Sequence, residues 1–411
     1  KAFFRVVTSA QARGQLAAFA PHTQSENVPV LKSVGRILAQ PLTSPVDLPH
    51  FNRTNMDGYA VRAPDTFGAS ASLPAYLKLV GAIEMGKEAK YKLRKGETMR
   101  IATGGMLPPG ANSMVMVEYT EELGDGTVEI LRSVSPWENI LRVGEDIKKK
   151  KPIFPAGRRL RAQDIGALTG VGINKVPVYR RPTVALISTG DEIVPPEKTP
   201  RPGQIRNVNQ YSLRAMISEC GGEVTDLGVI KDDPQAFTQA MTTALKVANV
   251  VMISGGSSVG VKDMTLDVIR SFPRSELFFH GISIAPGKPT IFAKAAGKPV
   301  MGLPGHPVSA LVVFALFGAP LVRMLGGESA DTAFIPPRTV QARLAQNIAS
   351  APGREDYVRV KLHNDTGAQL AQPLPGKSGA IFSLVQADGM VCIPHNEEGR
   401  EAGEEVEVIL F

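Results

Sequence analysis

The sequence is poor in cysteine, and this scarcity limits the kinds of stabilisation and chemistry that it can use. Only Cys220 and Cys392 occur among 411 residues, and they lie far apart. Two distant cysteines exclude a disulfide framework and a cysteine-based zinc cluster, and they fit a reducing compartment. The six histidines show no spacing typical of a metal cluster or a catalytic triad.

The sequence also lacks an uninterrupted apolar run long enough to cross a membrane. Its longest apolar stretch, Val308 to Leu325, contains Gly318, Pro320 and Arg323, and we interpret it as a buried helix. At the N-terminus the apolar residues soon give way to polar ones, unlike the apolar core of a secretory signal. We therefore expect a cytoplasmic protein without a membrane partner.

Positive charge is only slightly in excess of negative charge, with a formal net charge of +7. A modest positive charge favours anionic partners. The densest basic run, Lys148 to Lys151, has the character of a solvated face, and no aromatic residues interleave with it to form a nucleic-acid platform. Small anions such as phosphates and oxyanions are the better prediction, and nucleic acid is not expected.

Residues 181–330 alternate between strand and helix patterns. Thr183 to Ile187 and Val250 to Ile253 have the composition of buried strands, whereas Asn209 to Cys220 carries apolar residues at helical spacing. Strands joined by helices predict a parallel, doubly wound sheet covered on both faces. Ligand sites in such sheets lie beyond the carboxyl ends of the strands.

The remaining sequence predicts three further parts. Residues 45–140 hold short apolar runs between Gly and Pro clusters, which indicates a small β-rich domain. Residues 1–44, with helical patterns, are expected to pack with residues 141–180 as a linking domain. Residues 331–411 alternate polar and apolar positions without a clear helix, which predicts a β-domain such as a barrel. The chain is thus expected to be a multidomain α/β protein.

A glycine-rich turn follows the strand at Val250 to Ile253. In Ser254 to Gly260, adjacent glycines would let backbone N–H groups approach a phosphate, with a helix N-terminus behind them. The Gly-Lys-Ser/Thr ending of a Walker A loop is absent. A purely structural turn is the alternative interpretation.

Several acidic residues occupy loop positions at the ends of predicted strands. Such carboxylates could bind Mg²⁺, which prefers oxygen ligands and is often shared with substrate phosphates. The alternative for each is a helix cap or a turn contact. The candidates are Asp57, Asp146, Glu192, Asp232 and Asp263.

Two proline- and glycine-rich turns lie ahead of the long apolar helix. Pro286 to Pro289 contains Lys288, and Leu303 to Ser309 ends in Ser309. These turns could present an ammonium group and a hydroxyl to an oxyanion. They could equally do no more than end the strands.

Taken together and in order, these motifs resemble those of the molybdopterin molybdenumtransferase family, over essentially the entire chain. The motifs that carry the resemblance are MDGYAV at Met56 to Val61, GED at Gly144 to Asp146, STGDE at Ser188 to Glu192, DDP at Asp232 to Pro234, SGGxSVGxxD at Ser254 to Asp263, PGKP at Pro286 to Pro289 and LPGHPVSA at Leu303 to Ala310.

The resemblance implies an elongated homodimer with a molybdopterin-binding α/β domain, an elongated β-rich domain, a linking domain and a C-terminal β-barrel. It implies a Mg²⁺-dependent reaction in which molybdate joins adenylylated molybdopterin and AMP is released. The adenylyltransferase that prepares this substrate is a candidate partner.

Residue by residue, the resemblance assigns catalytic, metal-binding and substrate-binding roles. Catalytic roles fall to Asp57, Thr103, Asp146, Glu192 and Asp263, the first three acting across the dimer interface. Metal binding falls to Glu192, Asp232 and Asp263. Substrate binding falls to Ser254, Gly255, Gly256, Gly260, Asp232, Lys288, Pro289, Pro304, Gly305, Ser309, Arg354 and Ser378.

The sequence departs from the family pattern at several positions near the implied anion site. Ala285, Gly281 and Leu141 stand where the family often has basic residues, and His306 stands where many members have Asn. A protonated His306 could restore one charge.

Two alternative functions remain open from the sequence: a tungstate-preferring paralogue, and a pterin carrier or scaffold without catalysis. The related adenylyltransferase is disfavoured by the large extent of chain outside the α/β domain.

Overall fold

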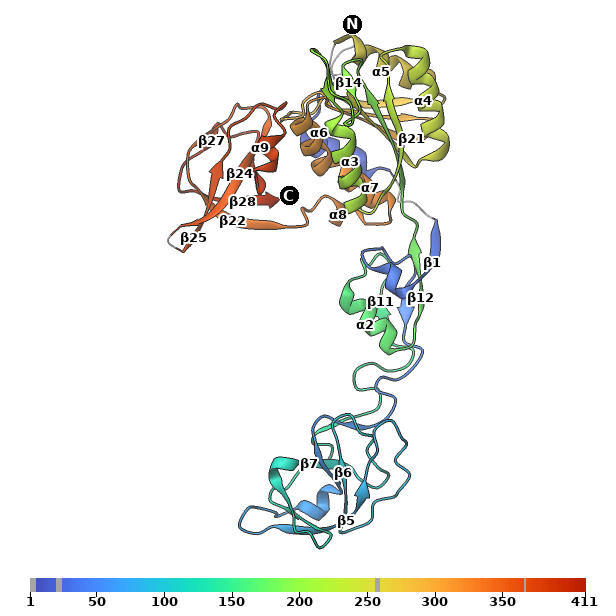
Figure 1. Cartoon of the computed structure of the whole chain (residues 1–411), viewed down its shortest axis with the longest axis vertical. Coiled ribbons are helices and arrows are strands. Elements are labelled where there is room, and N and C mark those ends of the chain that lie inside the picture. Colours follow the sequence, from blue (N-terminus) through green and yellow to red (C-terminus); the bar gives the residue numbers. More distant parts are fainter. Residues whose placement is uncertain (1–4, 20–23, 256–258, 366) are drawn as a thin grey trace.

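The computed structural model describes residues 5–19, 24–255, 259–365 and 367–411, with the backbone alone for residues 259–263. The chain forms an extended molecule (Figure 1). An α/β body and a β-barrel lie at one end, a small linking module lies in the middle, and a β-rich module lies at the far end.

The α/β body is built on a six-stranded sheet of order β16-β13-β17-β21-β20-β18. Its first four strands are parallel, whereas β20 and β18 run antiparallel at one edge. This edge differs from the fully parallel sheet expected from the sequence, because the two residues Ala296 and Gly297, both at positive φ, turn β20 directly into β21. The strands are β13 (Thr183–Thr189), β16 (Glu223–Ile230), β17 (Val250–Gly255), β18 (Glu276–His280), β20 (Ile291–Ala295) and β21 (Lys298–Leu303).

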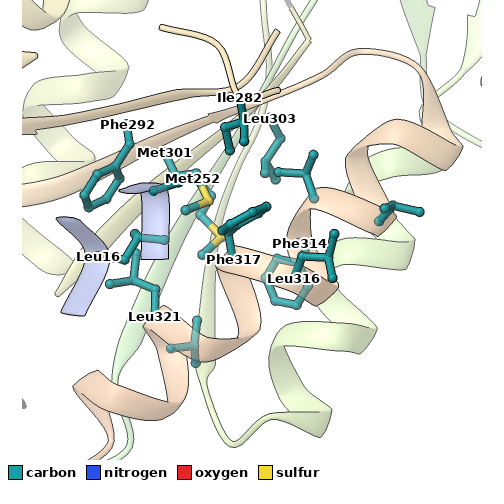
Figure 2. Close-up of a cluster of buried hydrophobic side chains, with 14 of the residues drawn as sticks. Leu16, Met252, Ile282, Phe292, Met301, Leu303, Phe314, Leu316, Phe317 and Leu321 are labelled. Carbon is teal, nitrogen blue, oxygen red and sulfur yellow. The ribbon is translucent and has the colours of Figure 1, made fainter. Parts of the chain in front are cut away.

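Helices cover both faces of this sheet because successive strand residues point to opposite sides. Val184 and Leu186 of β13 join the cluster formed with α3, α6 and α7, while Ala185 and Ile187 face α4 and α5. Figure 2 shows the first cluster, in which Met252 and Phe317 pack closely. The helices are α3 (Val208–Glu219), α4 (Pro234–Val247), α5 (Val259–Ser271), α6 (Pro307–Val313) and α7 (Ala319–Leu325), with a π-helical turn at Phe314–Gly318 and short α8 (Ala330–Ala333). The body is doubly wound, as predicted.

The N-terminal helix α1 (Ser9–Ala17) packs on the α/β body. Its buried residues Ala12 and Leu16 belong to the same core cluster as residues of β13 and α3, and Val7 bridges Ile282. Figure 2 shows Leu16 within this cluster. This differs from the assignment of residues 1–44 to the linking domain. A helical pattern shows which face is apolar, but it does not show which of two neighbouring cores the face will cover.

The apolar stretch Pro307–Leu325 is the one helical segment in the described ranges with the length and hydropathy of a membrane span, and it is 83% buried. It runs through α6, the π-helical turn and α7 in the core of the α/β body. This placement confirms the prediction of a buried helix.

The linking module is made from two separated stretches of sequence. Strand β1 (Ser25–Pro29) pairs with β12 (Lys175–Tyr179), and β2 (Leu42–Thr43) pairs with β11 (Pro152–Phe154). Helix α2 (Ala162–Gly170) and a 3-10 turn at Val30–Ser33 complete it around a small core. Two adjacent chain segments then lead to the β-rich module, where Leu48 bridges Ile147 and the Ser44 N–H donates to the Lys151 carbonyl.

The β-rich module contains a six-stranded sheet of order β7-β4-β6-β5-β9-β8. Its strands are β4 (Gly58–Val61), β5 (Ala75–Ala82), β6 (Glu97–Ile101), β7 (Ser113–Met116), β8 (Thr120–Glu122) and β9 (Thr127–Ile130), with 3-10 turns at Ala63–Thr66 and Val117–Tyr119. Near the connection to the linking module, β3 (Arg53–Thr54) pairs with β10 (Ile140–Leu141).

The C-terminal part closes into a five-stranded barrel, because β24 pairs with both β25 and β26. The barrel strands are β22 (Thr339–Leu344), β24 (Glu355–Asp365), β25 (Ala368–Pro373), β26 (Gly389–Ile393) and β28 (Glu405–Leu410), accompanied by β23 (Ile348–Ala349), β27 (Gly399–Arg400) and α9 (Phe382–Val385). Strand β19 (Ile284–Ala285) of the α/β body also pairs with β24, so the barrel is attached to the body by backbone hydrogen bonds.

Candidate functional site

A cavity of about 740 Å³ lies between the α/β body and the barrel. The body contributes the turn at residues 283–289 and the loop at residues 304–309, and the barrel contributes residues 351–354 and Ser378. Seven predicted site residues meet here from sequence positions up to 90 residues apart: Lys288, Pro289, Pro304, Gly305, Ser309, Arg354 and Ser378.

The ionisable side chains that line this cavity, among the residues that the structure describes, are all basic: Lys288, His306 and Arg354. Lys288 is exposed. Arg354 is held in place by a carboxylate, with its Nε 2.8 Å from Oδ1 of Asp356, and Ser350 donates to the same carboxylate. A cavity with ammonium and guanidinium groups on opposite walls is suited to a small, compact anion.

Hydrogen bonds join the two walls of the cavity. Nδ1 of His306 lies 2.8 Å from Oγ of Ser378, and the Val308 N–H donates to the Ser378 carbonyl at 3.0 Å. On the body side, Gly287 has φ +119, and a Cβ there would lie 2.4 Å from Cγ2 of Val313. Only glycine therefore fits the turn that presents Lys288.

A second group of predicted residues lies at the carboxyl ends of the parallel strands. Ser254 in β17 pairs with Ser188 in β13 on one side and with Leu303 in β21 on the other. A Cβ on Gly255 would lie 2.2 Å from the carbonyl oxygen of Thr189, and Gly255 has φ +121. The strand end therefore requires glycine. Because glycine has no side chain, the backbone at this edge of the sheet is left uncovered.

Asn209 of α3 connects these strand ends, and it was not among the residues predicted from the sequence. Its buried Nδ2 donates to Oγ of Ser254 and to the carbonyl of Gly305, both at 2.8 Å. The side chain thereby ties the end of β17 to the loop that enters the cavity. The available signal was the polar residues Asn207, Asn209 and Gln210 at the start of a helix, which also fit helix capping by Asn207.

Four buried polar atoms at this edge have no hydrogen-bond partner among the described residues. They are Oγ of Ser188, Oγ1 of Thr189, Oδ1 of Asn209 and Oδ1 of Asp232. Leaving such an atom unpaired costs about 1–3 kcal/mol. Their concentration at one edge of the sheet is typical of a binding site whose ligand would supply the missing contacts.

The acids at this edge form a small carboxylate group. Asp232 follows β16, and its backbone N–H lies 3.4 Å from Oδ1 of Asp191. Burial raises the pKa of Asp232, and the charges of Asp191 and Glu192 raise it further. No cluster of three or more metal-ligating side chains is arranged to hold a metal ion in the described part of the chain. The side chain of Asp263, the third predicted ligand, lies outside the described residues. Gly256 also lies outside them, and Gly260 is described by its backbone alone.

Three predicted catalytic residues lie away from both groups. The backbone N–H and the hydroxyl of Thr103 donate to Oδ1 of Asp57 at 2.6 and 2.8 Å, and they hold the pKa of Asp57 below its usual value. Both residues belong to the β-rich module, and Asp146 lies in the connection leading to it. Figure 1 places this module at the opposite end of the molecule from the barrel and the α/β body.

Comparison with known proteins accounts for this division of the chain. Residues 7–172 match the MoeA N-terminal region (domain I and II), residues 185–324 match a probable molybdopterin binding domain, and residues 341–411 match the MoeA C-terminal region (domain IV). The chain belongs to the MoeA family. This membership places it among the transferases of molybdenum cofactor biosynthesis.

Individual relatives cover nearly the whole chain. A putative molybdopterin biosynthesis protein of Methanocaldococcus jannaschii is 36% identical over 94% of this chain and 92% of its own length. A molybdopterin molybdenumtransferase of Haemophilus influenzae is 32% identical over 99% of both chains. A crystal structure of the molybdopterin biosynthesis MoeA protein of Pyrococcus horikoshii is 42% identical, covers 99% of both chains and has a TM-score of 0.81. The match extends to all the modules described above.

Proposed function

We propose that this chain is a molybdopterin molybdenumtransferase that inserts molybdate-derived metal into adenylylated molybdopterin and releases AMP. The observation that carries the proposal is the basic cavity between the α/β body and the barrel, in a chain of the MoeA family. Molybdate is a compact dianion, and Lys288, His306 and Arg354 line a space that can receive one.

The side chains of the cavity have separate tasks in this proposal. Lys288 supplies a point charge on a flexible stem, whereas Arg354 is fixed by Asp356 and presents donors in a set direction. Ser309 and Ser378 bring hydroxyl groups that orient an oxyanion oxygen. Such fixed donors stabilise charge that develops as the metal oxyanion reacts with the pterin sulfurs.

The pterin and its pyrophosphate are assigned to the carboxyl edge of the sheet. The polar atoms of Ser188, Thr189 and Asn209 that have no partner among the described residues can pair with a polar ligand, and Gly255 allows its close approach to the backbone. Ser254, Gly256 and Gly260 complete the proposed phosphate contact.

The carboxylate group at the same edge fits Mg²⁺. Oδ1 of Asp232 is buried without a partner among the described residues, and its neighbours Asp191 and Glu192 add negative charge that a cation would neutralise. Asp232 and Glu192 would hold the ion, with Asp263 as the third ligand. One or two carboxylates together with substrate phosphates are a common set of Mg²⁺ ligands. The chemistry that a bound Mg²⁺ supplies is charge neutralisation at the pyrophosphate, which makes AMP a better leaving group.

We further propose that the chain acts as a homodimer. Asp57 and Thr103 are preorganised by two hydrogen bonds, yet they belong to the module farthest from the cavity in the same chain. A second copy, arranged so that its β-rich module reaches the cavity, would bring Asp57, Thr103 and Asp146 to the bound substrate.

The decisive experiment mixes the purified protein with adenylylated molybdopterin, Mg²⁺ and either molybdate or tungstate, and follows AMP release together with metal retained in the pterin product. We expect AMP release that depends on the oxyanion and on Mg²⁺, with metal incorporated. The relative rates with molybdate and tungstate would rank the two metals. Tight pterin binding without AMP release would overturn the proposal in favour of a carrier.

A further inference from the structure

We infer that oxyanion binding in the cavity between the body and the barrel takes up a proton at His306. This inference rests on the proposed function, because it concerns the same oxyanion. It makes the affinity of the cavity for the oxyanion depend on pH near neutrality. The observation behind it is the hydrogen bond between Nδ1 of His306 and Oγ of Ser378, which connects the two walls of the cavity.

A neutral imidazole and a serine hydroxyl together offer one donor to an anion. If the Ser378 hydroxyl donates to Nδ1, the ring proton lies on Nε2 and is available to the anion. If Nδ1 carries the proton and donates to Oγ, the hydroxyl proton is available instead. In both arrangements one of the two protons is used up between His306 and Ser378 themselves.

Protonation of His306 raises the number of donors available to the anion from one to two. An imidazolium donates from Nδ1 to Oγ of Ser378, which leaves both Nε2–H and the Ser378 hydroxyl available to the anion. It also adds one positive charge to a wall opposite Arg354. A bound dianion is therefore stabilised more by the charged form, and the equilibrium draws one proton from the buffer to the imidazole.

The sign of the pH dependence follows from this coupling. Because the protonated form binds the anion better, affinity is high at the acid end of the range and falls as pH rises. Imidazole is the side chain that changes charge between about pH 5 and 8. We expect molybdate to bind on the order of tenfold more tightly at pH 6 than at pH 8.

The other charged groups around His306 do not reproduce this behaviour. Lys288 and Arg354 line the same cavity and add fixed positive charge to it. Asp356 is ion-paired with Arg354 at 2.8 Å. Lys377, next to Ser378, is exposed.

A second histidine on the barrel provides a matched control. The carbonyl of His395 accepts a hydrogen bond from the Gly353 N–H, at the rim of the cavity, but its imidazole is exposed and does not line the cavity. His395 should therefore contribute nothing to proton uptake, although it lies on an adjacent segment.

Isothermal titration calorimetry of the full chain with molybdate at pH 6, 7 and 8, in two buffers of different ionisation enthalpy, measures both the Kd and the protons taken up. We expect a fraction of a proton per molybdate in the wild type and in His395→Asn. We expect none in His306→Asn, whose Kd should be nearly independent of pH. Lys288→Met should weaken binding at every pH while leaving the proton uptake in place.

Zero proton uptake by the wild-type protein, no measurable molybdate binding, or unchanged uptake in a folded His306→Asn variant would each overturn the inference. The wild-type measurement needs no variant, so the test stands even if His306→Asn fails to fold. The AMP assay is read separately. Absence of AMP release alongside proton-coupled molybdate binding would count against the proposed transferase and leave this inference standing.

Discussion

Replacing Gly255 by alanine should damage the strand end at the proposed pterin site. The added Cβ would lie 2.2 Å from the carbonyl oxygen of Thr189 and 2.8 Å from its Oγ1, while Cβ contacts below 3.0 Å force neighbouring atoms to move. The obstacle is backbone of the adjacent parallel strand, which cannot rotate away. The residue would also have to keep φ near +121, outside the range that alanine favours.

The magnitude follows from these two effects. An unfavourable backbone conformation costs about 1–2 kcal/mol. Displacement of packed backbone adds roughly 1–3 kcal/mol. We therefore expect Gly255→Ala to lower the free energy of unfolding of the α/β body by about 2–5 kcal/mol and to weaken binding of adenylylated molybdopterin. Urea unfolding, followed by hydrogen exchange in β13 and β17, measures the first, and fluorescence titration of the pterin measures the second.

Gly228 offers a matched control in the same sheet. It also has positive φ, +76, but a Cβ there would meet no atom within 4 Å. Gly228→Ala should therefore show the conformational cost of about 1–2 kcal/mol alone and bind the pterin normally. Equal losses of stability in the two variants, or unchanged pterin binding in Gly255→Ala, would refute the argument that the strand end needs a bare backbone.

Three further predictions test other parts of the molecule. Asp164→Asn should destabilise the linking module by about 2–3 kcal/mol at pH 7, because Arg158 holds the pKa of Asp164 at about 2. Since that pKa is lowered, the contribution is present above about pH 4 and is lost as pH falls towards 2 in acid unfolding, whereas Asp267→Asn on an exposed helix face should change little. Asp263→Ala should fold normally and abolish AMP release; full activity would remove Asp263 from the mechanism. Ala285→Lys, which adds a charge to the cavity wall, should strengthen molybdate binding, and an unchanged dependence on molybdate concentration would contradict that role.

The elements of the fold could largely be predicted from local pattern, because burial leaves a periodic trace in the sequence. The strand at Thr183 to Ile187 and the buried helix near Val308 to Leu325 are where the pattern places them. The antiparallel edge of the sheet was not predicted. It depends on a two-residue turn at Ala296 and Gly297 that leaves only a weak sequence signal.

For the candidate site, the sequence predicts the turns that carry individual residues but not the cavity that they form together. Turn motifs identify Lys288 and Ser309 as neighbours of strand ends, but the cavity exists only because β19 pairs with β24 of the barrel. Pairing between distant segments has no local signature. Asn209 was missed because a buried bridging amide at a helix start has the same sequence pattern as an ordinary cap.

The β-rich module is joined to the rest of the chain by two segments that lie side by side, bridged at Leu48 and Ile147. Two bridged segments restrict rotation of the module about the connection more than a single linker would. In the homodimer proposed above, this restriction would limit the orientations in which the module presents Asp57 to the other copy.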